Sequence, residues 1–422
     1  MKFPNFHFIS AKINSVKDKG FFHLLSSNFV IQFLGFGVIL FLPSVLTPAE
    51  IGNVRLLQSY SVIFILIGTF GYNVSLLKIC SEDVSTEEKN LVFKYCIQRT
   101  LLFSFLSYVL LIGINYYYIR HINPILGKWL PLYGSIIPFA SIVYCLTAYL
   151  QSQKKIKDVA VVQVIVRLIF LVLIIISTYY FGFIGFIFST VISYIVGILP
   201  FILFIPLSSV TVIGSTHRKK QINNYAYYTV LGAFVTTIGL YADLYLLDYL
   251  NVSDIRLGVY SFSTLFLQAG MIAVNTIQSI VSPYISEQQD DKQWVWKKTV
   301  HYQGICVLFS ILIAIVLYLG SVFMTTFYLG EQYSELPDFV LGIIGRFLIW
   351  SCFAVVGASL VGLGRFKEGF YLALLTTPIG IVLGYTLFPQ WGIYGIIIAQ
   401  MIAALITLTG CWAILWKVVR NK

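Results

Sequence analysis

The sequence predicts an all-α integral membrane protein, and three properties of its composition lead to that prediction. Hydrophobic residues occupy 58% of the 422 positions and charged residues only 11%, and the mean hydropathy is +0.86. A soluble domain usually carries about a quarter charged residues. Aromatic residues, 16% of the total, gather near the ends of apolar runs, as in the interfacial belts of helical bundles. The alternating pattern of a membrane β-barrel is not seen.

Twelve apolar runs are long enough to cross the hydrocarbon core, which takes roughly 20 residues of α-helix. The fifth and sixth runs nearly touch, and Gly182 and Gly185 predict a turn between them. We expect each run to form one membrane span. The runs cover residues 23–46, 56–79, 96–119, 129–151, 158–180, 182–207, 225–250, 256–283, 302–329, 338–361, 369–388 and 391–416.

Lysine and arginine are distributed unevenly over the segments outside these runs. The two termini and the even-numbered loops hold 22 of the 28 basic residues, and the odd-numbered loops hold four. Cytoplasmic loops are the ones enriched in Lys and Arg, so both termini are expected to be cytoplasmic. The net charge of +11 is then expected to face anionic lipid headgroups. Nucleic acid is not expected as a partner, because the chain has no soluble basic module.

Several classes of enzyme and cofactor site have no support in the sequence. The longest loops, 80–95 and 284–301, are too short to hold a soluble catalytic domain. No two of the six cysteines form a C-x-x-C pair and the five histidines are scattered, so we expect no metal site and regard the cysteines as packing residues. No Walker A motif is present. No cofactor is therefore expected, and the energy for any transport would come from an ion such as a proton or sodium, or from trapping of the product.

The sequence contains an internal repeat with an offset of 210 positions. "YFGFIGFIFST" (180–190) and "QWGIYGIIIAQ" (390–400) both place an aromatic residue before Gly-x-x-Gly and continue into an apolar run. "AYLQSQKKIKDV" (148–159) lies over "ASLVGLGRFKEG" (358–369) at the same offset, with charged residues aligned. Agreement of glycine and charged positions at loops is hard to obtain by chance. The first pair is expected to form the tight turn before the last helix of each half.

A third pair of similar phrases extends the repeat. Gly52 in "LTPAEIGNVRLLQSY" lies over Gly258 in "NVSDIRLGVYSFST" at an offset of 206. The repeat predicts an N-terminal six-helix bundle (1–210), a cytoplasmic linker (211–221) and a C-terminal six-helix bundle (222–422). Because each half crosses the membrane an even number of times, the two copies are parallel repeats, and a substrate path is expected where they meet.

Three phrases resemble one known family. They are "FGYNVSLLK" (70–78), "GVYSFSTLFLQ" (258–268) with Asp243 upstream, and "IQSIVSPYISEQQDD" (277–291). Their order and spacing resemble the polysaccharide transporter branch of the multidrug/oligosaccharidyl-lipid/polysaccharide (MOP) exporter superfamily, and within it the Wzx-type flippases. The resemblance implies a MATE/MOP-like V-shaped pair of bundles in a bacterial inner membrane.

The resemblance also implies a function. Wzx-type flippases move undecaprenyl-diphosphate-linked oligosaccharide units to the outer leaflet for O-antigen or capsule assembly, and they are not enzymes. The partners implied are the lipid-linked oligosaccharide, membrane lipids, a polysaccharide polymerase and a chain-length regulator. Alternating access between the two halves is the expected mechanism.

Ionisable residues inside spans are candidates for function, since each costs about 2.5–3.5 kcal/mol to insert. Asp243, in the seventh run, is the candidate proton or sodium site, whereas Asp248 is expected to be solvated near the interface. Arg346, Arg55 and Lys78 are candidates for binding a diphosphate, because guanidinium and ammonium groups suit phosphate. Structural pairing for Asp243, packing for Arg346 and interfacial snorkelling for the others remain open alternatives.

Amide side chains are the candidates for binding sugar hydroxyls. The family plan places the first, second, seventh and eighth helices around the central cavity, and the amides on the first and eighth share one helix face in each case. Hydrogen bonding between helices is the alternative role. The amide candidates are Asn28, Gln32, Gln58, Gln268, Asn275 and Gln278.

Two rival functions remain open. One is transport of another kind, by a drug or ion antiporter of the same superfamily or by a major-facilitator protein, which also has two parallel six-helix halves. The other is enzymatic, as a membrane glycan polymerase or a glycosyltransferase. Such enzymes are expected to have a long outer loop, and the first outer loop here, "TPAEIGN", is minimal.

Overall fold

The structure is a computed structural model, and every regular element in the part of the chain that it describes is a helix. Nine of these helices are long and apolar enough to span a membrane, or ten if α7 (Pro124–Gly134) and α8 (Ile136–Ser152), which are bent by 44°, form one span. The predicted all-α membrane class is confirmed. The described residues are 34–420 except 36, 39, 83–84, 154, 206–213 and 289. The first predicted span, 23–46, lies mostly outside them.

Apolar runs fold as helices here because lipid offers no hydrogen-bond partners to the backbone. Several helices begin at a side chain that accepts a bond from a free backbone N–H of the first turn. The Ser85 hydroxyl accepts from Glu88 N at the start of α5 (Thr86–Ile114), at 3.2 Å. The Asp291 carboxylate accepts from Trp294 N at the start of α14 (Lys292–Met324), at 2.9 Å.

The other main helices overlap the predicted runs, and one of them covers both the fifth run and most of the sixth. They are α3 (Pro48–Thr69), α4 (Tyr72–Cys80), α9 (Ile156–Val196), α12 (Lys219–Tyr249), α13 (Asp254–Glu287), α15 (Leu336–Gly362), α16 (Phe366–Trp391) and α17 (Ile393–Arg420). Short elements connect them: Leu42–Ser44, Asn115–Ile119, α6 (Arg120–Ile122), α10 (Leu199–Ile202), Thr325–Leu329 and Glu331–Tyr333.

The second predicted span differs from the prediction, because it is broken. The sequence predicts one run over 56–79, whereas α3 ends at Thr69 and α4 begins at Tyr72. Phe70 and Gly71 lie between them with φ angles of 45° and 72°. A side chain on Gly71 would press on the carbonyl oxygen of Ala226 in α12, so the bend and the close approach both favour glycine there.

The chain divides into two compact units. Unit 1 contains Met1–Leu46 and Leu57–Phe234, and unit 2 contains Thr47–Leu56 and Val235–Lys422. The boundaries fall inside α3 and α12, so each of these helices contributes to both units. The limits 1–210, 211–221 and 222–422, which follow the sequence repeat, stay a prediction.

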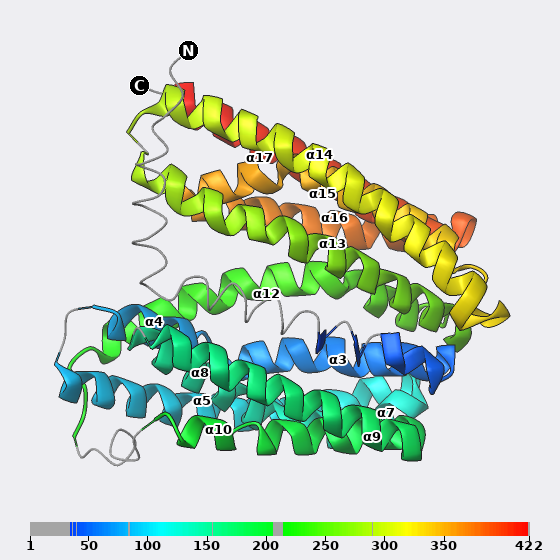
Figure 1. Cartoon of the computed structure of the whole chain (residues 1–422), viewed down its shortest axis with the longest axis horizontal. Coiled ribbons are helices and arrows are strands. Elements are labelled where there is room, and N and C mark those ends of the chain that lie inside the picture. Colours follow the sequence, from blue (N-terminus) through cyan, green and yellow to red (C-terminus); the bar gives the residue numbers. More distant parts are fainter. Residues whose placement is uncertain are drawn as a thin grey trace. The chain divides into compact units, whose positions relative to one another are not determined.

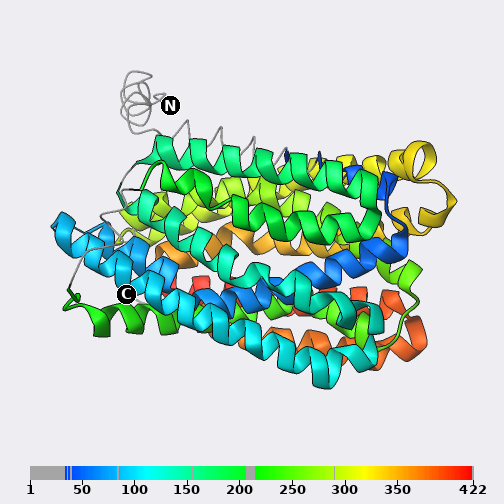
Figure 2. The ribbon, with the colours of Figure 1, turned by 90° about the horizontal axis from the view of Figure 1, so that it is seen from below.

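Each unit has its own apolar core. In unit 1, buried residues of α4, α5 and α8 form a cluster that includes Leu76, Phe93 and Tyr149, with the last two rings stacked at 4.1 Å. In unit 2, α15 and α17 pack through a cluster that includes Val356 and Leu415. Within each unit the long helices run side by side (Figure 1). Figure 2 shows the helices of unit 1, blue to green, along one common direction.

The backbone repeats at the predicted offset. Gly182, inside α9, has φ 56° and ψ −138°, and Gly392, between α16 and α17, has φ 57° and ψ −136°. Each glycine therefore makes the same sharp break before the last helix of its half. A side chain on Gly185 would overlap the carbonyl oxygen of Ser177, and one on Gly395 would lie 2.6 Å from that of Leu387. The predicted Gly-x-x-Gly turn is confirmed in both halves.

Two further features repeat with the same offset. A π-helical turn occupies Asn115–Ile119, and another occupies Thr325–Leu329. The residue before α9, Lys155, has φ −80° and ψ 56°, and Arg365, before α16, has φ −87° and ψ 49°. The aligned basic residues of the sequence repeat thus have equivalent positions at helix starts.

Gly182→Ala and Gly392→Ala are expected to destabilise the protein to a similar degree. Nothing lies within 4 Å of a side chain added at either position, so the effect is purely one of backbone conformation. This conformation is costly for any residue other than glycine, by about 1–3 kcal/mol. Thermal unfolding of each purified variant measures the effect. Gly113→Ala, at a helical glycine with equally open surroundings, is the control and should unfold no earlier than wild type. Equal unfolding temperatures for all three variants would contradict the prediction.

Candidate functional site

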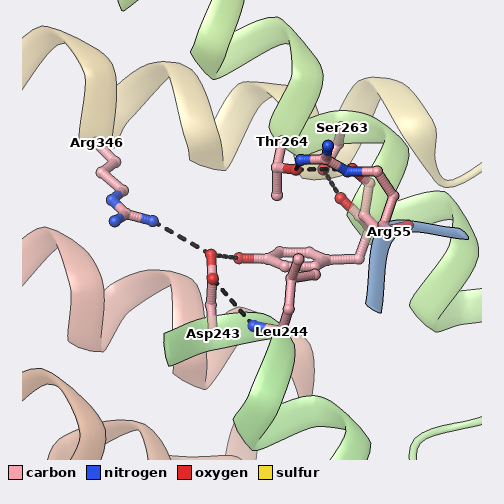
Figure 3. Close-up of polar contacts among 8 residues, drawn as sticks. Arg55, Asp243, Leu244, Ser263, Thr264 and Arg346 are labelled. Carbon is pink, nitrogen blue, oxygen red and sulfur yellow. Dashed lines mark hydrogen bonds and ion pairs between the residues drawn. The ribbon is translucent and has the colours of Figure 1, made fainter. Parts of the chain in front are cut away.

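A buried carboxylate forms the centre of the candidate site, in unit 2. Asp243 lies in α12 and is only 2% exposed. Its Oδ1 accepts a hydrogen bond from the backbone N–H of Leu244 at 2.9 Å. Its Oδ2 accepts from the hydroxyl of Tyr260 on α13 at 2.7 Å and from Nη1 of Arg346 on α15 at 3.2 Å (Figure 3). One carboxylate thus ties three helices together.

The pair of Asp243 and Arg346 is enclosed by protein. The Arg346 side chain is 15% exposed, and the Tyr260 side chain is among the largest fully buried ones. A charge removed from water needs a partner charge and hydrogen bonds, and each member of this pair supplies them for the other. A proton or a sodium ion that binds Asp243 must compete with the guanidinium of Arg346. The arrangement can therefore couple binding of a small cation to release of an arginine.

A second buried cation belongs to the same unit. Arg55, on the part of α3 that belongs to unit 2, is 8% exposed, and its Nη2 donates to the hydroxyl of Thr264 on α13 at 3.2 Å (Figure 3). The Thr264 hydroxyl in turn donates to the carbonyl of Ser261 at 2.7 Å. Arg55 is therefore anchored inside protein, and snorkelling to an interface does not describe it.

One face of α13 carries the polar residues of the site. Tyr260, Thr264 and Gln268 follow one another at intervals of four, and Asn275 and Gln278 continue the same face. Gln278 donates to the carbonyl of Ala354 on α15 at 2.8 Å, which is the interhelical role that the sequence left open. Asn275 is exposed and Gln268 is half-buried. For the other two amides, Gln268 and Asn275, a role in substrate binding stays a prediction.

Two glycines allow α3 and α13 to approach each other at this site. A side chain on Gly52 would lie 3.1 Å from Cα of Gly258, and one on Gly258 would overlap the carbonyl oxygen of Pro48. These glycines are the pair that the sequence repeat aligned. Small residues at a crossing bring helix backbones close together inside a membrane. The crossing places Arg55, one turn beyond Gly52, against α13.

The structure thus brings together Asp243, Arg346 and Arg55 around α13 in unit 2. Lys78 is exposed near the end of α4, in unit 1, and Gln58 belongs to the unit 1 part of α3. Asn28 and Gln32 lie outside the described residues. The substrate-binding and ion-coupling roles of all these residues stay predictions.

One expectation was wrong, and two residues were missed. Asp248 was expected to be solvated, but it is buried, with only 8% of its surface exposed. Tyr260 and Thr264 were not singled out, although both belong to the phrase "GVYSFSTLFLQ". Their position on the same face as Gln268 was the signal that could have identified them.

Comparison with known proteins gives one family and one fold. Residues 18–289 match the model of a family described as polysaccharide biosynthesis protein. No curated protein matches the sequence. An inward-facing multidrug resistance MATE family transporter of the MOP superfamily is similar in structure, with a TM-score of 0.77 and 13% identity over 93% of this chain and 96% of that one.

Two other structures illustrate the range of proteins with this fold. The lipid II flippase MurJ, in an inward closed conformation, has a TM-score of 0.73 and 14% identity, and the match covers 94% of this chain and 90% of that one. A MATE transporter of Vibrio cholerae has a TM-score of 0.67 and 14% identity, with 97% and 98% covered. At such identities the likeness shows the fold and does not specify what is transported.

Proposed function

Because this chain belongs to the polysaccharide biosynthesis protein family, we propose that it is a flippase for undecaprenyl-diphosphate-linked oligosaccharides. It moves each repeat unit from the cytoplasmic to the outer leaflet of a bacterial inner membrane, with both termini in the cytoplasm, for assembly of O-antigen or capsule. The family match over 18–289 is the observation that carries this proposal. A fold shared with a lipid II flippase supports it, because lipid II is also a lipid-linked glycan.

The charged residues of the site support a role in transport. Buried ionisable residues in a membrane bundle are costly and typically mark substrate or ion pathways. Under the proposal, Arg55 and Lys78 contribute cations for the diphosphate, and Gln58, Gln268 and Asn275 contribute amides for sugar hydroxyls. Asn28 and Gln32 are proposed for the same role from the sequence alone. The polyprenyl tail stays in lipid, and the two repeated halves give access to alternate sides.

Asp243 is the proposed site of ion coupling. Its Oδ2 is held by Arg346 and Tyr260, so a proton or a sodium ion at this carboxylate would release the guanidinium. Arg346, once released, becomes free to bind the substrate diphosphate. Binding of the coupling ion would in this way change the affinity for substrate, which is the coupling that an ion-driven transporter requires.

A deletion strain tests the proposed substrate. We expect loss of the surface polysaccharide and accumulation of one complete lipid-linked unit on the cytoplasmic face. A missing polymerase would instead leave single units in the outer leaflet, so accessibility of the glycan to an external lectin in spheroplasts separates the two. Loss of drug resistance with intact surface polysaccharide would favour the antiporter and contradict the proposal. The polymerase and chain-length regulator are the proposed partners downstream.

A further inference from the structure

A cavity of about 370 Å³ lies in unit 1, beside the first half of α5 and the start of α12. Its volume falls in the usual range for ligand pockets, roughly 300–1,000 Å³. Three of the described residues that line it are cations and none is a carboxylate. The lining residues are Leu91, Lys94, Tyr95, Gln98, Arg99, Leu102, Gly214, Ser215 and Lys219.

Two of these cations converge on one aromatic ring. The guanidinium carbon of Arg99 lies 5.2 Å from the ring centroid of Tyr95, and Nζ of Lys219 lies 6.0 Å from it. The Tyr95 hydroxyl donates to Oδ1 of Asn223, which also accepts from the hydroxyl of Tyr72, each at 3.1 Å. The hydrogen bond at its hydroxyl therefore holds the Tyr95 ring in position. The positive charges of Arg99 and Lys219 repel each other, and an anion bound between them would offset this repulsion.

Two carboxylates of the neighbouring segments have other partners. Glu82 forms an ion pair with Arg218, and Glu88 accepts a hydrogen bond from the hydroxyl of Thr216. These contacts hold the segment between Ser215 and Lys219. They place Lys219, the first residue of α12, at the cavity, where the unpaired N–H groups of a helix start add positive potential.

The cavity sits where the surface of α5 changes from polar to apolar. Lys94, Gln98 and Arg99 line it, and Leu102 forms its apolar side with 47% of its surface exposed. Beyond Leu102, Phe105 and Leu106 continue the exposed apolar face of the helix. A molecule with its anionic head in the cavity can therefore lay an apolar tail along α5.

We propose that this cavity binds the phosphate group of a membrane lipid, on the side of the membrane that the sequence predicts to be cytoplasmic. Arg99 and Lys219 supply charge-assisted hydrogen bonds to the phosphate oxygens, and Tyr95 holds both cations in place. The apolar edge at Leu102 favours a lipid over a soluble phosphate. The site is confined to unit 1 and does not rest on the proposed transport function.

Native mass spectrometry of the full-length protein tests this site. Dioleoylphosphatidylglycerol and undecaprenyl phosphate are each titrated against wild type and against the Arg99→Gln/Lys219→Gln variant. Arg99 and Lys219 each supply charge-assisted hydrogen bonds to the phosphate, so the loss of both side chains should weaken binding about tenfold or more. The matched control is Lys89→Gln/Lys220→Gln, which removes two charges from the same helices at positions that do not line the cavity, and it should bind like wild type.

Each outcome has a defined meaning. Tighter binding of one lipid identifies whether a phospholipid or the polyprenyl carrier is the source of the phosphate. Either result supports the site. Equal weakening in the control pair would overturn the proposal, as would displacement of the lipid by inorganic phosphate at the same concentration. If the double variant is not recovered folded, Arg99→Gln is compared with Lys89→Gln, and equal affinities would again overturn the proposal.

Discussion

Asp243→Asn is expected to reduce export of the lipid-linked glycan at least about tenfold in a complemented deletion strain. The amide cannot balance the charge of Arg346, and removal of one partner of a buried ion pair typically costs 3–5 kcal/mol. It also removes the site at which a proton or sodium ion would bind. Surface polysaccharide per cell, normalised to the amount of protein in the membrane, is the measurement.

Two companion variants separate coupling from folding. Asp254→Asn removes an exposed carboxylate at the start of α13 and should export like wild type. Asp243→Asn/Arg346→Gln removes both charges, so it should be more stable than Asp243→Asn alone while export stays low. If Asp243→Asn leaves both export and its dependence on ion gradients unchanged, the coupling role is wrong.

Gly258→Ala is expected to have the largest effect of any single methyl group added to unit 2. The new Cβ would overlap the carbonyl oxygen of Pro48, which is a backbone atom at the start of α3 and has no side-chain freedom to move away. The two helices must separate, and overpacking of this kind costs about 1–3 kcal/mol or more. The separation would also move Arg55 away from Thr264. Thermal unfolding in detergent and export in cells should both decrease.

Gly304→Ala is the matched control. Gly304 is a glycine inside α14, and nothing lies within 4 Å of a side chain added there. Gly52→Ala should fall between the two, because its nearest contact of 3.1 Å can relax by a small shift. The same unfolding temperature for Gly258→Ala and Gly304→Ala would show that the crossing is not as close as the structure describes.

The repeat explains why so much of the fold could be predicted from the sequence. The turns at Gly182 and Gly392 could be predicted because both residues have positive φ angles, a conformation that strongly favours glycine. The glycine itself therefore indicates the turn. The apolar runs predicted the helices, because the thickness of the bilayer sets the length of a membrane-spanning helix. The family match to polysaccharide biosynthesis proteins bears out the family that the sequence resembles, and the fold is the one found in a MATE transporter of the MOP superfamily and in a lipid II flippase.

The site was harder to predict, because its contacts join residues far apart in the chain. Asp243 and Arg346 were both identified by the cost of a charge in an apolar run. Their pairing could not be predicted, because they are 103 positions apart and the contact depends on how α12 and α15 pack. Tyr260 resembles any aromatic residue of a buried helix until its hydroxyl is seen to meet the carboxylate. The break at Phe70 and Gly71 was hidden by the uniform hydrophobicity of the run around it.

Translocation by the purified protein in liposomes tests the proposed function most directly. Undecaprenyl-diphosphate-linked oligosaccharide is placed in the vesicles, and its exposure on the other leaflet is followed with a lectin or a glycosidase that cannot cross the membrane. The account predicts that wild type moves the glycan with no change in its length and that Asp243→Asn does not. Movement equal to that in protein-free vesicles, or a longer glycan after incubation, would contradict it.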